Sequence, residues 1–152
     1  MIHGLGVDIV HHPRIAKLFL RNAAGLVRRI LTDPEQARYQ VLAEDKKLPF
    51  LCTTWAIKEA AYKAAQPLPS SWKDAEVYHL KSGAPALRTS PNVPLDFKVS
   101  VSHDGEYTIA SVLASNLPKS LMDKRGTGEM IDEHERDIPR KPDAADAWIN
   151  KW

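Results

Sequence analysis

Apolar positions alternate with other residues at the start of the chain, which predicts a β-strand over residues 2–10. One face of this strand carries Ile2, Gly4, Gly6, Asp8 and Val10. Asp8 interrupts an apolar pattern, and the glycines on its face would let a ligand or another backbone approach its carboxylate closely. Such a carboxylate needs a metal ion or a cationic side chain as its partner. The alternative is an aspartate that caps a turn at the strand end.

Helical periodicity and turn signals divide the rest of the chain into further elements. Helices are predicted over residues 13–21, 25–31, 34–44 and 49–65. Strands are predicted over residues 74–80, 84–88, 97–103 and 106–114. This order favours an α+β domain, in which a small antiparallel sheet packs against a long central helix and shorter helices.

The central helix carries a carboxylate between an aromatic ring and an ammonium on one stripe. Trp55, Glu59 and Lys63 are spaced four residues apart, so they lie on the same helix face. A solvated Glu–Lys pair on an exposed face is the simplest explanation of this spacing. Asp8 is a second acid that could act together with Glu59 on this stripe.

An Asp-Gly dipeptide at 104–105 separates two β-rich runs and predicts a hairpin, because both residues tolerate the backbone of a tight turn. His103 then lies at the rim of the sheet, beside the turn. A histidine at such a rim is either a plain surface residue or a catalytic or binding group.

Three segments together resemble the signature of the holo-acyl-carrier-protein synthases, the small 4′-phosphopantetheinyl transferases. They are Gly-Val-Asp-Ile at 6–9, Trp-Ala-Ile-Lys-Glu-Ala at 55–60 and Val-Ser-His-Asp at 101–104. Their order and spacing make the combination far more specific than any one segment. The resemblance covers residues 1–115, which we expect to form one transferase domain.

The resemblance implies transfer of the 4′-phosphopantetheine group from coenzyme A to a serine of apo acyl carrier protein, with release of adenosine 3′,5′-bisphosphate. It implies Mg²⁺ held by Asp8 and Glu59, and these two acids with Lys63 as the catalytic residues. Two carboxylates suit this ion, which prefers hard oxygen ligands and retains several waters. The coenzyme-binding residues implied by the resemblance are Lys58, Lys63, Ser102 and His103.

A basic strip on the first predicted helix is the candidate docking surface for the carrier protein. Arg14, Lys17 and Arg21 recur at helical spacing, and Arg28 follows shortly. A solvated basic face that aids solubility is the alternative. The resemblance implies that an acidic acyl carrier protein docks on Arg14, Arg21 and Arg28, where complementary charge would speed encounter.

Two features depart from the family pattern. Thr54 stands where many members have an arginine immediately before the aromatic residue, which puts part of the 3′-phosphate contact in doubt. Residues 67–71 are rich in proline and serine where relatives tend to have glycines, so the loop over the nucleotide should have a different shape.

Composition limits the possible classes of protein. A chain of 152 residues with 43% hydrophobic residues suits one core and one domain. A net charge of +2 is too small to indicate nucleic-acid binding, and no apolar run is long enough for a membrane span. The single cysteine, Cys52, and the start of the chain on a strand favour an intracellular protein.

Residues 116–152 form a polar extension, expected to be partly flexible, with a possible short helix at 143–151. This extension favours a eukaryotic, mitochondrial member of the family, with the cytoplasm as the alternative. A homotrimer with active sites between protomers is expected from the resemblance, and a small sheet with an open edge agrees with it.

Two other function classes remain open at the level of the sequence. A metal-dependent phosphodiester or nucleotide hydrolase would use the same two acids but would not need the basic strip. A non-enzymatic module that binds a carrier protein would keep the strip and tolerate loss of Glu59.

Overall fold

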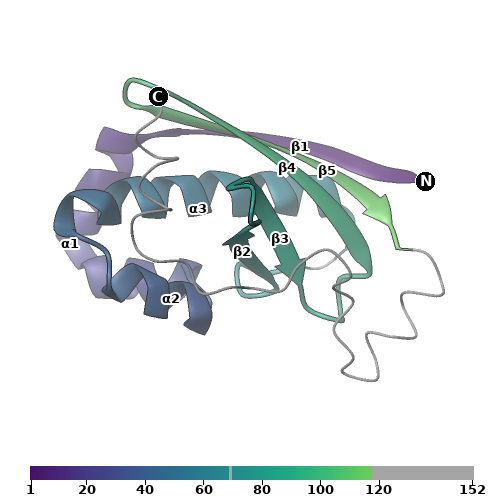
Figure 1. The fold of residues 1–152 in the computed structure, drawn as a ribbon, viewed down its shortest axis with the longest axis horizontal. Coiled ribbons are helices and arrows are strands. Elements are labelled where there is room, and N and C mark those ends of the chain that lie inside the picture. The colour runs from purple at the N-terminus through teal and green to yellow at the C-terminus, as the bar shows by residue number, and fades with distance from the viewer. Residues whose placement is uncertain (69, 118–152) are drawn as a thin grey trace.

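The computed structural model describes residues 1–68 and 70–117 (Figure 1). Its elements, in chain order, are β1 (Ile2–His11), α1 (His12–Ile30), α2 (Asp33–Gln40), α3 (Glu44–Ala65), β2 (Ala75–His79), β3 (Pro85–Thr89), β4 (Leu95–Asp104) and β5 (Tyr107–Asn116). The extension predicted to be flexible, and the helix predicted at 143–151, lie outside the described residues, except for the first two positions of the extension.

The described strands form two antiparallel sheets, and the long helix α3 lies along one face of the larger one (Figure 1). The larger sheet has the strand order β1-β5-β4, and the smaller sheet pairs β2 with β3. The core contains apolar side chains from α3 and from the inner faces of β1, β4 and β5. The predicted α+β architecture is therefore confirmed.

The helices differ from the predicted boundaries in three places. The first two predicted helices are one element, α1, with a kink at Asn22, whose side-chain oxygen accepts the Gly25 N–H at 2.8 Å. The third ends at Gln40 rather than at residue 44. The central helix begins at Glu44, before Pro49, because a proline removes only one backbone hydrogen bond and the acidic first turn favours a helix start.

Strand β1 and helix α3 approach each other so closely that β1 has room only for glycine at two positions. A Cβ on Gly6 would lie 1.9 Å from the Ala60 carbonyl oxygen, and a Cβ on Gly4 would lie 2.3 Å from that of Ala64. Alanines at 60 and 64 keep the facing side of the helix equally small. The sequence predicts that these glycines let a ligand or another backbone approach Asp8. In the structure, the backbone of α3 is what approaches.

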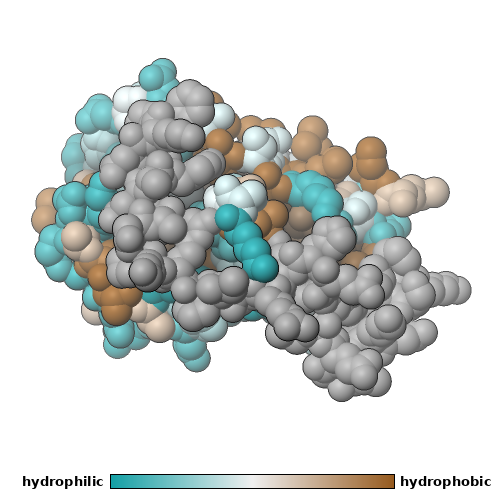
Figure 2. All heavy atoms as spheres, viewed as in Figure 1, coloured by the Kyte–Doolittle hydropathy of each residue, from teal (hydrophilic) through white to brown (hydrophobic). Residues whose placement is uncertain are grey.

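The outer face of the larger sheet is apolar and exposed. Its most exposed large side chains are Ile2, Leu5, Val7 and Ile9 on β1, with Tyr107 and Ile109 on β5. In Figure 2, apolar residues gather at the upper right, over the region where β1 and β5 run in Figure 1. A contiguous apolar surface of this kind marks a contact with another molecule more often than a free surface.

The close approach predicts that Gly6→Ala lowers the free energy of unfolding by about 2 kcal/mol or more, because overpacking against a backbone cannot relax by side-chain rotation. Gly105→Asn is the control, because a Cβ there meets nothing within 4 Å and asparagine tolerates its positive φ. Chemical denaturation of both variants would measure the difference. Equal losses would show that the contact between β1 and α3 is not tight.

Candidate active site

Asp8 and Lys63 form an ion pair between the middle of β1 and the last turn of α3. The Lys63 Nζ lies 2.9 Å from Asp8 Oδ1 and 3.0 Å from the Val7 carbonyl oxygen. The Asp8 side chain is 14% exposed and that of Lys63 is 46% exposed. The sequence analysis expects a metal ion or a cationic side chain beside Asp8. In this structure the partner is the cationic side chain of Lys63.

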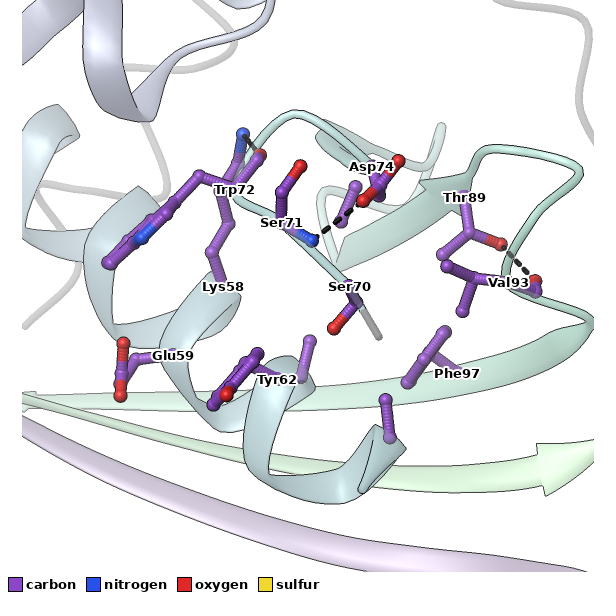
Figure 3. Close-up of a pocket in the computed structure, with 13 residues that line it drawn as sticks. Lys58, Glu59, Tyr62, Ser70, Ser71, Trp72, Asp74, Thr89, Val93 and Phe97 are labelled. Carbon is purple, nitrogen blue, oxygen red and sulfur yellow. Dashed lines mark hydrogen bonds between the residues drawn. The ribbon is translucent and has the colours of Figure 1, made fainter. Parts of the chain in front are cut away.

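Glu59 lies one helical turn before Lys63 and lines a cavity of about 120 Å³. Figure 3 shows Glu59 and Tyr62 projecting from α3 on the side where Ser70, Ser71 and Trp72 pass. The Ser71 N–H donates to Asp74 Oδ2 at 2.6 Å, which fixes the turn that forms this wall. The cavity is therefore lined by two carboxylates, Glu59 and Asp74, and by polar loop groups along one side.

Lys58, which the resemblance assigns to coenzyme binding, has its ammonium in the interior. Its Nζ donates to Glu35 Oε2 at 2.6 Å and to the carbonyl oxygens of Ile30 and Trp72, both at 2.8 Å. Burial lowers the pKa of Lys58, and the Glu35 carboxylate opposes that shift. These three acceptors match the three donors of an ammonium group, so the geometry favours a structural role over contact with a phosphate.

Glu35 is fully buried and completes this network. It accepts hydrogen bonds from the backbone N–H groups of Thr32 at 2.6 Å and Val77 at 2.7 Å, in addition to the bond from Lys58. Thr32 and Glu35 form a capping box at the start of α2, and Glu35 also bonds outside that helix. It connects the start of α2 to α3 and to strand β2.

The basic strip on α1 is exposed along its length, including Arg14, Lys17, Arg21 and Arg28. The Arg14 guanidinium lies over the Trp55 ring at 5.6 Å from its centroid. Trp55 in turn contacts Trp72 edge to face, with 5.1 Å between ring centroids. Arg14 is thus held beside the aromatic residue that begins the Glu59 stripe, and Arg21 and Arg28 lie further along α1.

His103 lies on the inner side of the sheet, while Ser102 lies on the outer side, as alternation along β4 requires. The His103 Nδ1 lies 2.9 Å from the buried Thr108 hydroxyl, and His12 Nε2 lies 2.8 Å from the same oxygen. Burial is the main cause that lowers the pKa of each histidine. The structure does not bring Ser102 to the same face as His103.

Sequence reasoning did not single out His12, Thr108 or the structural role of Glu35. Thr108 is 96 residues from His12 in sequence, and no motif links them. The alternation along β5 places Thr108 on the inner face, so its burial can be predicted from the sequence. Its two histidine partners depend on the pairing of strands, which a local pattern does not define.

The part of the chain that the structure describes contains no group of three or more histidine, cysteine or acidic side chains arranged to hold a metal ion. A site built from two carboxylates remains compatible with this finding. Among the same residues, no helix is long and apolar enough to cross a membrane.

Comparison with known proteins gives the class of this domain. Residues 4–112 match the family model of the 4′-phosphopantetheinyl transferase superfamily. The holo-[acyl-carrier-protein] synthase of Anoxybacillus flavithermus is 36% identical over 120 residues, which are 77% of this chain and 98% of that protein. The enzyme of the same name from Bacillus velezensis is 35% identical over 122 residues, 78% of this chain and all of that protein.

Solved structures agree with this class. The Bacillus anthracis holo-(acyl-carrier-protein) synthase, in complex with CoA (3′,5′-ADP), is 29% identical, with a TM-score of 0.66 over 77% of this chain and 99% of that one. The Neisseria meningitidis holo-[acyl-carrier-protein] synthase is 25% identical, with a TM-score of 0.69 over 76% of this chain and all of that one. The chain therefore belongs to the holo-[acyl-carrier-protein] synthase family within the 4′-phosphopantetheinyl transferase superfamily.

The buried pair predicts that Lys58→Met lowers the free energy of unfolding by about 3–5 kcal/mol, because Glu35 would keep a buried charge without its cationic partner. Lys47→Met is the matched control. Its ammonium pairs with Glu44, whose side chain is 86% exposed, so little change is expected. Equilibrium denaturation measures both. A similar small loss in the two variants would contradict a structural role for Lys58.

Proposed function

We propose that Asp8, Glu59 and Lys63 are the catalytic residues of this holo-[acyl-carrier-protein] synthase. The enzyme transfers the 4′-phosphopantetheine group from coenzyme A to a serine hydroxyl of apo acyl carrier protein and releases adenosine 3′,5′-bisphosphate. The observation that carries the assignment is the 2.9 Å contact between Asp8 on β1 and Lys63 on α3, one turn from Glu59. Two motifs far apart in the sequence thereby meet at one place.

The donor set at this place fits Mg²⁺. Asp8 and Glu59 supply carboxylate oxygens, which are the hard ligands this ion prefers, and a shell completed by phosphate oxygens and waters is usual for it. Neither residue is fully buried, so a hydrated ion could reach both. When bound, the ion would neutralise pyrophosphate charge and stabilise the charge on the leaving group.

Lys63 would contribute a positive charge of its own to the same place. Its ammonium is half exposed, so one side can hold Asp8 while the other meets an anionic ligand. The Val7 carbonyl oxygen, 3.0 Å from Nζ, limits the directions in which this side chain can turn. Lys63 would therefore orient the Asp8 carboxylate and attract the phosphates of coenzyme A.

The assignment predicts that Asp8→Asn and Glu59→Gln each lower the rate of transfer by about 10²-fold or more, where each ~1.4 kcal/mol is tenfold. Raised Mg²⁺ should partly restore each variant, because mass action offsets weaker binding. The double variant should be scarcely slower than the slower single variant, since both acids would serve one ion. Mass spectrometry of the carrier protein measures the transfer.

Asp96→Asn is the control, because this acid lies on β4 and pairs with exposed Lys98. Transfer at the wild-type rate in either single variant, with an unchanged melting temperature, would remove that acid from the site and favour a binding module. Breakdown of coenzyme A without modification of the carrier would favour a hydrolase.

The basic strip is proposed to dock an acidic acyl carrier protein through Arg14, Arg21 and Arg28. Its exposed guanidinium groups support this, because complementary charge accelerates encounter between proteins. The contact of Arg14 with Trp55 would place the bound carrier next to the stripe that carries Glu59.

Reversal of Arg14 and Arg21 to glutamate should raise the KM for the carrier protein at least about tenfold and leave the KM for coenzyme A nearly unchanged. Added salt should reduce the difference, because exposed charges are screened beyond about 8 Å at physiological ionic strength. Lys98→Glu, a charge reversal on β4, is the control. An equal rise in both KM values would assign the strip to the nucleotide site.

A homotrimer with active sites between protomers is proposed for the assembly. The exposed apolar face of β1 and β5 supports contact with another copy of the chain. Val7→Glu on that face should lower the mass measured by light scattering from three protomers to one and reduce transfer. Val41→Glu, at a more exposed valine that follows α2, should do neither. A monomeric mass for fully active wild-type enzyme would refute the proposal.

The mitochondrial compartment favoured from the polar extension stays a prediction. The relatives named above are bacterial, so they support no organelle. Imaging of the full chain with a fluorescent fusion, in cells of its source, would separate mitochondrion from cytoplasm.

A further inference from the structure

One buried hydroxyl joins two histidines at the end of the sheet beside the turn between β4 and β5. Thr108 is fully buried, and its Oγ1 lies 2.8 Å from His12 Nε2 and 2.9 Å from His103 Nδ1. Thr108 is opposite Val10 on β1 and opposite His103 on β4, while His12 begins α1. The hydroxyl therefore bridges two rings that are 91 residues apart in the sequence.

A threonine hydroxyl has one proton and two lone pairs, so it can donate to only one of the two rings. Both histidines have a pKa lowered by burial, so both are neutral near pH 7, and a neutral imidazole carries a single N–H. If His12 Nε2–H donates to Thr108, the hydroxyl donates to His103 Nδ1 and the His103 proton lies on Nε2. In the reverse arrangement, and in one where both rings donate to the oxygen, His103 Nδ1–H donates and its Nε2 is an acceptor.

The chemistry of the ligand selects among these arrangements. Coenzyme A presents phosphate oxygens, which accept hydrogen bonds. With Nδ1 engaged by Thr108, a phosphate would meet the other ring nitrogen, and only the first arrangement places a proton there. The other arrangements would direct a lone pair at an anion.

We propose that His12 and Thr108 are positioning residues, which hold His103 in the tautomer with its proton on Nε2, oriented to donate to a phosphate oxygen of coenzyme A. This inference rests on the proposed function and on the coenzyme contact that the resemblance implies for His103. Neither His12 nor Thr108 would itself touch the substrate. Their effect would pass through the orientation and tautomer of one ring.

The test combines ¹⁵N NMR of the histidine side chains with steady-state kinetics of the full chain. In wild-type protein, the ¹⁵N shifts should report the Nε2–H tautomer for His103. Thr108→Val keeps the shape and removes the hydroxyl, so the tautomer should become mixed. The KM for coenzyme A should rise about three- to tenfold, as expected for one hydrogen bond, while kcat changes less than about twofold.

Matched pairs of variants separate the hydrogen bond from packing. Thr108→Ser keeps the hydroxyl and should behave as wild type. His12→Phe keeps a ring without a donor, so its KM for coenzyme A should rise as that of Thr108→Val does. His12→Gln keeps an N–H donor, so its KM should stay close to the wild-type value. His11→Gln is the control, because His11 stacks on Tyr107 and lies near Glu106 rather than on Thr108.

A wild-type His103 with its proton on Nδ1 would overturn the proposal, as would an unchanged KM for coenzyme A in a Thr108→Val protein whose tautomer has shifted. His103→Ala distinguishes this failure from failure of the proposed function. If that variant keeps the wild-type KM for coenzyme A, His103 is not a coenzyme residue and the positioning role fails with it. The catalytic assignment of Asp8 and Glu59 would be unaffected.

Discussion

The close packing of β1 on α3 is the constraint on which the proposed active site depends. Gly4 and Gly6 remove the side chains that would hold the strand away from the helix, and Ala60 and Ala64 keep the facing helix surface small. The next inward position after Gly6 is Asp8. Its carboxylate therefore reaches the Lys63 ammonium at 2.9 Å, and a looser contact would separate the two motifs that supply the proposed catalytic residues.

The buried pair of Glu35 and Lys58 holds the other side of α3 in place. Lys58 connects the end of α1 and the segment at Trp72, and Glu35 adds the start of α2 and strand β2. Removing such charges from water is costly, so the pair contributes through defined geometry more than through net attraction. Lys58 and Glu59 both line the cavity, and the turn of about 100° between consecutive helix residues lets the Lys58 ammonium reach the core while Glu59 projects on another side.

The sequence predicted the elements and the faces that follow from local periodicity. Alternation along β1 placed Asp8 with the glycines, and helical spacing placed Glu59 and Lys63 on one stripe. Lys58 is different, because its acceptors are carbonyl groups of distant segments, which no local pattern reveals. Likewise, the bridge from His12 to His103 depends on strand pairing across 96 residues, and the kink at Asn22 depends on one side-chain hydrogen bond.

We propose that the contact between β1 and α3 assembles one metal site from Asp8 and Glu59. Crystals of the full chain grown with coenzyme A and Mn²⁺, which binds oxygen ligands as Mg²⁺ does, test it directly through anomalous scattering. A manganese peak is expected in each active site, within bonding distance of a carboxylate oxygen from each of Asp8 and Glu59. A peak that contacts neither acid, or only one of them, would contradict it.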